Sequence, residues 1–136
     1  VELSDGLIDQ VLSAVRTLPS PQCEIFIASL GGAINRVPAR ATPYPHRSVE
    51  YVMNVHTRWS SPEDDKACIA WARSFYDAAA PFATGGVYVN FMPDDEAQRV
   101  RSGAYGPNYE RLAAIKAKYD PKNLFRVNQN VAPAGG

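Results

Sequence analysis

The stretch CEIFIASLGGAINRVP, residues 23–38, decides the fold that the sequence predicts. Two runs with the composition of β-strands, residues 24–29 and 33–37, flank the pair Gly31-Gly32. Because paired glycines between two such runs are typical of a tight turn, the stretch predicts a β-hairpin. An antiparallel sheet of this kind can bury one face and leave the other open, so the rest of the chain decides how the sheet is covered.

Outward from this hairpin, the chain predicts two further strands and three helices. Alternating side chains predict strands over residues 49–59 and 87–91. The loop at residues 39–48 contains prolines at positions 43 and 45, which exclude a central strand there. Apolar residues three and four positions apart predict the helices. These helices span residues 4–18, 61–80 and 108–119, with Ser4, Ser61 and Asn108 as their N-caps.

The predicted elements define an α+β fold, a two-layer antiparallel sheet with helices packed on one face and the other face free. At 136 residues the chain is long enough for a single domain with its own core. Two helical stripes should contribute to that core. They consist of Cys68, Ala72, Phe75 and Ala79 in the middle helix, and of Leu112, Ile115 and Tyr119 in the last one.

The charge balance argues against two classes of partner. Acidic and basic residues number 14 each, so the chain lacks the basic surface that nucleic acid or an anionic membrane would bind. No apolar run reaches the roughly 20 residues that a membrane span requires, and the N-terminus lacks the pattern of a signal peptide. We expect a soluble chain in the cytoplasm, with no nucleic acid and no membrane as partner.

The cysteines and histidines do not form a recognisable metal or nucleophile motif. Cys23 and Cys68 lack CxxC spacing, and Cys68 lies in a helical stripe where a small buried thiol is the ordinary interpretation. His46 and His56 are ten residues apart and share no ligand-type neighbours, so neither is a convincing base or metal ligand alone. The sequence therefore predicts no metal site.

The stretch GGVYVNFMPDD, residues 85–95, carries an unusual polar pair. Tyr88 and Asn90 would share one face of the predicted strand 87–91, although strands tend to exclude asparagine. Each of these side chains ends in a polar group, which needs a hydrogen-bond partner if it is buried. The pair has two interpretations of equal weight: it lines a pocket, or it forms a structural hydrogen bond.

Longer motifs resemble a known family. The segment AYGPNYERLAAIKAKYDPKNLFRVNQNVAP, residues 104–133, resembles the C-terminal segment of the berberine bridge enzyme-like flavoprotein oxidases, with their Y-G-x-N-Y-x-R-L and K-Y-D-P-x-N-x-F patterns. The family's Y-x-N strand corresponds to residues 88–90. Residues 31–47, GGAINRVPARATPYPHR, are similar to a Gly-Gly-Ala hairpin and Pro-His-Arg loop of bacterial members. Within the chain, residues 30–103 then form the sheet and helix core, and residues 104–133 the berberine bridge-like segment.

The resemblance implies an FAD-dependent oxidoreductase that oxidises an alcohol, an amine or an activated C–H group. In that family an N-terminal domain binds FAD, and a C-terminal α+β domain covers the flavin ring with its free sheet face. Residues 1–136 would be this C-terminal substrate-binding and cap domain, which the absence of an initiator Met supports. Its partners would be its own N-terminal FAD-binding domain and a small-molecule substrate. We expect no FAD on this chain alone, and no activity.

The resemblance also implies site residues. Family members often place a Tyr or His base one position after the Y-x-N pattern, but here that position is Phe91, which cannot take a proton. Tyr88 is then the candidate catalytic base, provided that a positive or strongly hydrogen-bonding group lies beside it. If it does not serve, the base comes from the missing domain or from elsewhere in the chain. The residues expected to face the cofactor are Tyr88, Asn90, Tyr105, Asn108, Asn128 and Asn130.

One alternative does not involve an enzyme. The chain would then be a stand-alone α+β module that binds a ligand or forms a homodimer through its exposed sheet face. For Asn108 and the tail at residues 128–130, structural roles as a helix cap and an interdomain strap remain open alternatives to cofactor binding.

Overall fold

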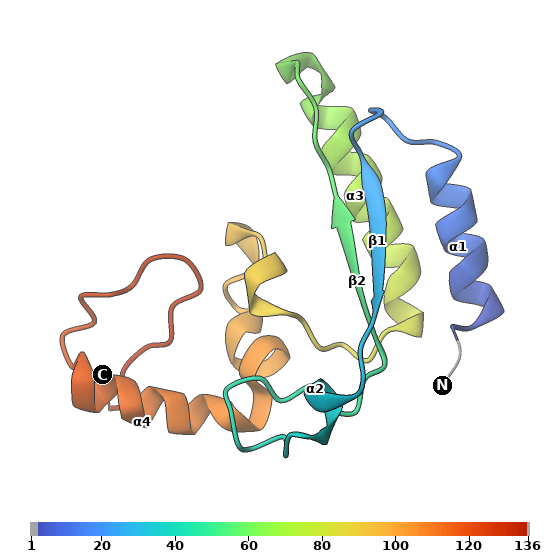
Figure 1. Cartoon of the computed structure of the whole chain (residues 1–136). Coiled ribbons are helices and arrows are strands. Elements are labelled where there is room, and N and C mark those ends of the chain that lie inside the picture. The colour runs from blue at the N-terminus through green and yellow to red at the C-terminus, as the bar shows by residue number, and fades with distance from the viewer. Residues whose placement is uncertain (1–2, 136) are drawn as a thin grey trace. The chain divides into compact units, whose positions relative to one another are not determined.

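The computed structural model describes residues 3–135, and its fold is α+β (Figure 1). The chain forms two compact units. The first consists of the chain up to Leu30 together with Glu50–Thr84. The second consists of Gly31–Val49 and the chain from Gly85 onward, so a loop from the first half of the sequence belongs with the C-terminal segment.

The first unit contains the antiparallel sheet. Strand β1, Glu24–Ser29, pairs with strand β2, Tyr51–His56, which confirms the strands predicted at residues 24–29 and 49–59. In the register of the pair, Glu24 lies opposite His56 and Ser29 lies opposite Tyr51. Because neighbouring side chains of a strand point to opposite faces, this register decides which residues share the open face of the sheet.

Two helices of the first unit follow the predicted caps. Helix α1, Asp5–Val15, begins after Ser4, whose hydroxyl oxygen accepts a hydrogen bond from the backbone N–H of Leu7 (3.3 Å). Helix α3, Asp65–Ala79, follows a single 3-10 turn at Pro62–Asp64. A second 3-10 turn, Ala80–Phe82, ends the helical segment at the predicted proline.

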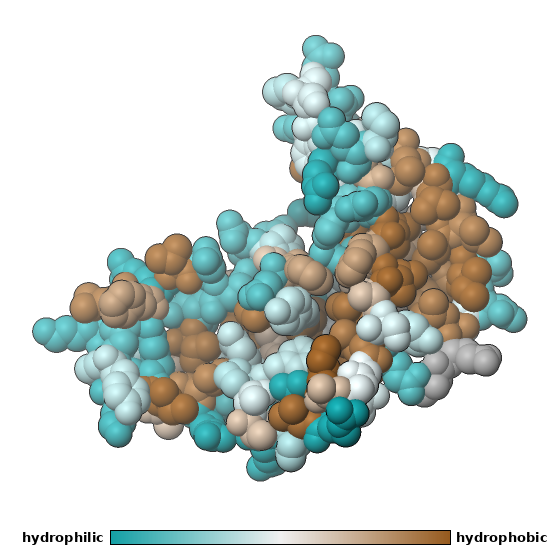
Figure 2. All heavy atoms as spheres, viewed as in Figure 1, coloured by the Kyte–Doolittle hydropathy of each residue, from teal (hydrophilic) through white to brown (hydrophobic). Residues whose placement is uncertain are grey.

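The core of the first unit lies between these helices and one face of the sheet. Leu7, Phe75 and Ala79 are buried there, and Ile25 and Val55, which are paired in the sheet, pack against them. This confirms the buried stripe predicted for the middle helix, in which Cys68 is also fully buried. Other apolar side chains of this unit reach the surface over α1 and β1, as Figure 2 shows. They include Ile8, Leu12, Val15 and Phe26, each about 40% exposed.

The predicted strand at residues 33–37 is wrong. These residues form a short helix, α2, Ala33–Arg36, after a backbone turn in which Gly32 has a φ of 56°. The partner of β1 is instead β2, and the backbone N–H of Leu30 donates to the carbonyl of Glu50 (2.6 Å) where the pairing ends. The glycine pair therefore ends the strand and turns the chain into the second unit, without closing a hairpin.

The predicted strand at residues 87–91 is also wrong. The backbone is extended at Tyr88 and then forms a 3-10 turn, Val89–Phe91, closed by a hydrogen bond from the N–H of Phe91 to the carbonyl of Tyr88. No neighbouring strand pairs with this segment in the described part of the chain, where β1 and β2 make up the sheet. A strand without a partner leaves its backbone groups unpaired, and Asn90 favours a turn, so the turn prevails.

The second unit is helical. Its longest helix, α4, Tyr109–Tyr119, confirms the predicted last helix, and the segment before it consists of short turns of helix. These are 3-10 turns at Asp94–Glu96 and Gly106–Asn108 and a π-helix at Val100–Tyr105. Among residues 3–135, no helix has the length and apolar character needed to span a membrane.

Helix α4 differs from the prediction in its cap and in its buried face. Asn108 forms no side-chain cap, because its amide nitrogen instead donates to the carbonyl of Ala39 (2.7 Å) in the 39–49 loop. Of the predicted stripe, Ile115 is 45% exposed and Tyr119 is 74% exposed, and the buried residue is Ala113. The predicted stripe is therefore wrong at these two positions, while Leu112 is partly buried.

Asp120 closes α4 through three hydrogen bonds, and this arrangement predicts an acid-sensitive step in unfolding. Its buried carboxylate accepts from Lys116 and from the backbone N–H groups of Leu124 (2.8 Å) and Phe125 (3.0 Å). The hydrogen bond from Lys116, assisted by the two backbone donors, holds the pKa of Asp120 below its ordinary value. Its contribution to stability is therefore complete above the ordinary pKa and is lost as the pH falls through the lowered one.

We expect the urea midpoint of the chain to fall over that acidic range. Asp120→Asn should lower the midpoint at neutral pH and should remove the part of the acid-induced fall that this carboxylate causes. Glu110→Gln is the matched control, since Glu110 pairs with Arg101 at an exposed surface, where an ion pair contributes little. Identical pH profiles for Asp120→Asn and the wild type would contradict the role of this carboxylate.

Candidate functional site

Tyr88 and Asn90, the pair at the centre of the predicted site, are in direct contact. The amide nitrogen of Asn90 donates to the Tyr88 hydroxyl at 3.0 Å, across the 3-10 turn that replaces the predicted strand. Tyr88 is 38% exposed, so the residue lies at the protein surface. Of the two interpretations, the structural hydrogen bond is present, and the exposed position leaves both groups accessible to a ligand.

Aromatic rings surround this pair. The Phe91 ring packs edge-on against Tyr88 with 5.0 Å between centroids, and the Tyr44 ring approaches Tyr88 edge-on at 6.1 Å. Tyr44 belongs to the predicted proline-rich loop, where the guanidinium of Arg47 lies 4.7 Å from its ring centroid. Burial raises the pKa of the Tyr44 hydroxyl above its ordinary value, although Arg47 opposes that shift. Tyr44 is therefore a neutral hydrogen-bonding group at physiological pH.

His46 is held in the same cluster by close packing. Its ring lies edge-on to Tyr44 at 5.4 Å between centroids. A Cβ atom at Gly86 would lie 2.6 Å from the His46 ring, so glycine at this position allows the close approach. The Nε2 atom of His46 is buried without a hydrogen-bond partner. An unpaired buried nitrogen is costly, so this atom marks a point where the packing leaves a polar group unsatisfied.

The remaining predicted residues occupy two other parts of the second unit. Tyr105 ends the π-helix and is half-buried, which raises the pKa of its hydroxyl. Asn108 is buried, and besides Ala39 its amide nitrogen contacts the carbonyls of Thr42 (3.0 Å) and Pro43 (3.4 Å). Asn108 therefore fastens the 39–49 loop to the start of α4. The assignment of Tyr105 and Asn108 to a cofactor stays a prediction.

The polar tail at residues 128–130 returns to the segment after Tyr88. The side-chain nitrogen of Gln129 donates to the carbonyls of Met92 (3.3 Å) and Pro93 (3.2 Å). Asn128 has a left-handed backbone with a φ of 60°, which asparagine tolerates better than most residues. The side-chain oxygens of Gln129 and Asn130 are buried without partners. The tail thus acts as a strap within the second unit, and its role toward a cofactor stays a prediction.

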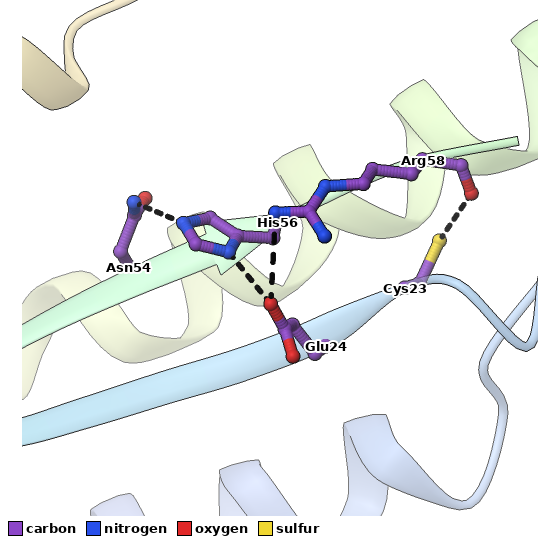
Figure 3. A network of polar contacts seen from close by, with 5 residues as sticks. All are labelled: Cys23, Glu24, Asn54, His56 and Arg58. Carbon is purple, nitrogen blue, oxygen red and sulfur yellow. Dashed lines mark hydrogen bonds and ion pairs between the residues drawn. The ribbon is translucent and has the colours of Figure 1, made fainter.

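A second polar cluster, which the sequence did not indicate, lies on the open face of the sheet in the first unit. The Nδ1 atom of His56 lies 2.8 Å from the Glu24 carboxylate, and its Nε2 atom lies 2.7 Å from the amide nitrogen of Asn54 (Figure 3). The guanidinium of Arg58 lies 3.9 Å from the same carboxylate. Only the register of β1 and β2 brings these residues together, and the sequence alone does not reveal that register.

The cysteines are free and buried. Cys23 lies just before β1, and its thiol contacts the carbonyl of Arg58 at 3.6 Å. Cys68 is fully buried in α3, and burial, together with the neighbouring Cys23 thiol, raises its pKa. A raised pKa disfavours the thiolate that a nucleophile or metal ligand requires. Within residues 3–135, no group of three or more Cys, His, Asp or Glu side chains is placed to hold a metal ion.

Known proteins share both the sequence and the fold of this chain. Residues 87–132 match the family described as "Berberine and berberine like". An uncharacterized FAD-linked oxidoreductase of Bacillus subtilis, YgaK, is 30% identical over 131 residues, which cover 96% of this chain. The match covers only 29% of that relative, so the chain spans less than a third of its length.

Solved structures share the fold of this chain. A variant of BBE-like 1 from Physcomitrella patens superposes with a TM-score of 0.82 at 26% identity, covering 95% of this chain and 27% of the other. The glycopeptide hexose oxidase DBV29, solved in complex with teicoplanin, has a TM-score of 0.81 at 26% identity and covers 97% of this chain and 30% of its own. Nearly the whole chain therefore corresponds to a part of much longer proteins.

Proposed function

We propose, on the premise that this chain belongs to the berberine bridge enzyme-like FAD-linked oxidoreductases, that it is the C-terminal substrate-binding part of such an enzyme. The reaction is the oxidation of an alcohol, an amine or an activated C–H group. The N-terminal FAD-binding domain and a small-molecule substrate are the partners, and the chain is inactive without that domain.

An uncovered apolar segment carries the proposal. After α4, the side chains of Leu124, Phe125 and Val127 are 73%, 80% and 82% exposed, and hydrophobic residues lie at the surface of this region in Figure 2. Adjacent large apolar side chains exposed to this extent mark a surface that contacts another protein part. The chain spans 29% of YgaK, so the rest of such a protein is large enough to cover this apolar segment.

The polar groups of the second unit fit a flavin ring. The edge of that ring offers both acceptors and donors of hydrogen bonds. The exposed residues Tyr88 and Asn90 supply complementary groups, a hydroxyl and an amide. Bound FAD would accept the hydride that leaves the substrate carbon, while these side chains orient the ring.

Deleting residues 1–136 from the full-length protein tests the proposal. We expect the truncated protein to keep the yellow colour of bound flavin. Under anaerobic conditions, however, it should no longer be bleached by any member of a substrate panel that bleaches the full-length protein. A suitable panel contains glucose, glycerol, benzyl alcohol and benzylamine. A truncated protein that is bleached at the full-length rate would show that residues 1–136 do not bind the substrate.

Substitution of the exposed segment gives a second, independent prediction. In the isolated chain, Phe125→Ser should change the free energy of unfolding by less than about 0.5 kcal/mol, because the ring is exposed. In the full-length protein the same change should cost about 2–4 kcal/mol, since the ring is then buried against the partner domain. Urea unfolding measures both values. Arg126→Ser, at the exposed position between Phe125 and Val127, is the matched control.

Equal and small effects of Phe125→Ser in the two proteins would mean that the segment is not an interdomain contact.

A further inference from the structure

The two cysteines of the chain are in contact inside the first unit. Cys23 precedes β1 and Cys68 lies in α3, so they come from segments that are far apart in the sequence. Both are free, and both are buried, with exposures of 4% and 0%. The side chain of Cys68 is hydrogen-bonded to that of Cys23. The interior of the unit therefore holds two thiols side by side.

The direction of the hydrogen bonds places the sulfur of Cys23 between two partners. The hydrogen bond to Cys23 raises the pKa of Cys68, which means that it stabilises the protonated thiol and that Cys68 is the donor. The Cys23 thiol in turn donates to the carbonyl oxygen of Arg58 at 3.6 Å, because a carbonyl can only accept (Figure 3). Cys23 thus links α3 to the segment that follows β2.

This arrangement suits a disulfide bond. In a disulfide the two sulfur atoms are about 2 Å apart, and two thiols that already share a hydrogen need only a short approach to reach that distance. No other group has to be displaced, since hydrogen-bonded atoms have nothing between them. A cysteine that only fills space in a core does not need a second thiol at its sulfur.

We propose that Cys23 and Cys68 form a reversible disulfide when the protein meets a small-molecule disulfide such as oxidised glutathione, and that this bond clips the start of β1 to helix α3. The pair is then a redox modification site. The inference is independent of the proposed function, because it uses contacts within the first unit alone.

Cys23 is the thiol that reacts first. It follows an exposed turn at residues 21 and 22, whereas Cys68 lies within a regular helix. The Cys23 thiolate attacks one sulfur of oxidised glutathione, which forms a mixed disulfide and releases one glutathione thiolate. The Cys68 sulfur then attacks the Cys23 sulfur, which forms the protein disulfide and releases the second glutathione. Two protein thiols are oxidised, one small disulfide is reduced to two thiols, and the two protein protons end on the released glutathione.

The second step is favoured by proximity. Burial raises the pKa of Cys68, as do the hydrogen bond to Cys23 and the nearby carboxylates of Asp64 and Asp65, so Cys68 alone is a poor nucleophile. Its attack on Cys23 is nevertheless intramolecular, and the effective concentration of a tethered group far exceeds that of a free thiol. We expect the bond to form faster as the pH rises, because only the thiolate attacks.

The disulfide would close a loop that contains the whole sheet, since β1 and β2 both lie between Cys23 and Cys68. A link of this kind restricts the unfolded chain and should lower the equilibrium constant for unfolding of the first unit by about 10²–10³-fold. Oxidation also removes the S–H that Cys23 donates to Arg58. The oxidised first unit should therefore open less often than the reduced one.

Peptide mapping of the full-length protein tests the bond. Trypsin cuts after Lys and Arg, so Cys23 lies in the peptide 17–36 and Cys68 in the peptide 67–73. After incubation with oxidised glutathione and alkylation of the remaining thiols, mass spectrometry without reductant should detect these peptides as one cross-linked species. Reduction before alkylation should separate them. The same oxidation is repeated during refolding from urea, so that slow access to a buried thiol cannot hide the reaction. Failure to detect the cross-link in both samples would overturn the proposal.

Two matched variants test the order of the steps. Cys68→Ala should leave Cys23 as a stable mixed disulfide with glutathione, because the second thiol is missing. Cys23→Ala should leave Cys68 unmodified in the folded protein. Equal modification of the remaining cysteine in the two variants would contradict the assignment of Cys23 as the first thiol.

Hydrogen exchange of the full-length protein tests the clip. The amides of β1 and β2 exchange when the first unit opens, so oxidation should slow their exchange by about 10²–10³-fold. The amides of α4, in the second unit, are the internal control and should exchange at the same rate in both forms. Equal exchange of β1 and β2 before and after oxidation would show that the bond does not stabilise the unit.

Discussion

Phe75→Ala should destabilise the first unit by about 3–5 kcal/mol, the cost of removing a buried aromatic side chain and leaving a cavity. Phe75 is 3% exposed and packs with Leu7 and Ala79, and its ring stacks on that of Trp71 at 6.5 Å between centroids. Domains of this size have about 5–15 kcal/mol of total stability, so the variant is expected to be partly unfolded at 37 °C. Urea unfolding followed by tryptophan fluorescence measures the loss.

A matched substitution on the same helix distinguishes burial from helix propensity. Ile69 is also in α3 but is 42% exposed, so Ile69→Ala should change the free energy of unfolding by about 0.5 kcal/mol or less. Similar values for Phe75→Ala and Ile69→Ala would mean that α3 does not bury the stripe described above.

Asn108→Asp should release the 39–49 loop of the second unit at a cost of about 3 kcal/mol. The substitution keeps the shape of the side chain but replaces a buried amide donor by a carboxylate oxygen. That oxygen would face the carbonyls of Ala39 (2.7 Å) and Thr42 (3.0 Å), so the hydrogen bonds are lost and repulsion takes their place. Hydrogen exchange should show faster exchange at Ala41 and Arg47, whose amides donate to the carbonyls of Pro38 and Pro45.

The exposed amide of Asn90 provides the comparison. Its nitrogen donates to the Tyr88 hydroxyl, and in Asn90→Asp the new carboxylate can accept from that hydroxyl. The change should cost less than about 1 kcal/mol and leave exchange in the 39–49 loop unaffected. If Asn108→Asp were equally mild, Asn108 would not be the residue that fastens the loop.

The helices were predictable because their signals are local. Ser4 caps α1 as the sequence indicates, Ser61 caps the 3-10 turn that leads into α3, and the α3 stripe follows from residues three and four positions apart. The strands depended on a partner that the sequence does not specify. Residues 24–29 pair with β2 instead of residues 33–37, and residues 87–91 have no partner strand in the described chain. A run of strand-forming residues without a partner takes up a turn or a short helix.

In the candidate site, too, contacts between residues close in sequence were more predictable than contacts between distant residues. Tyr88 and Asn90 were expected to share one face of a strand, but a 3-10 turn brings them into contact instead. The Glu24–His56 pair was not predictable, because the residues are 32 positions apart and meet only through the strand register. The roles predicted for Tyr88 and the tail residues toward a flavin rest on the family resemblance, because no local pattern specifies a cofactor contact.

The absorption spectrum of the isolated chain tests most directly whether the flavin site lies outside it. The chain, purified after expression in cells that supply FAD, should be colourless, and the full-length protein prepared in the same way should show the absorption of bound flavin. The spectrum of the denatured samples quantifies flavin per chain. Stoichiometric flavin on the isolated chain would contradict the proposal that it is the substrate-binding part of a longer flavoprotein.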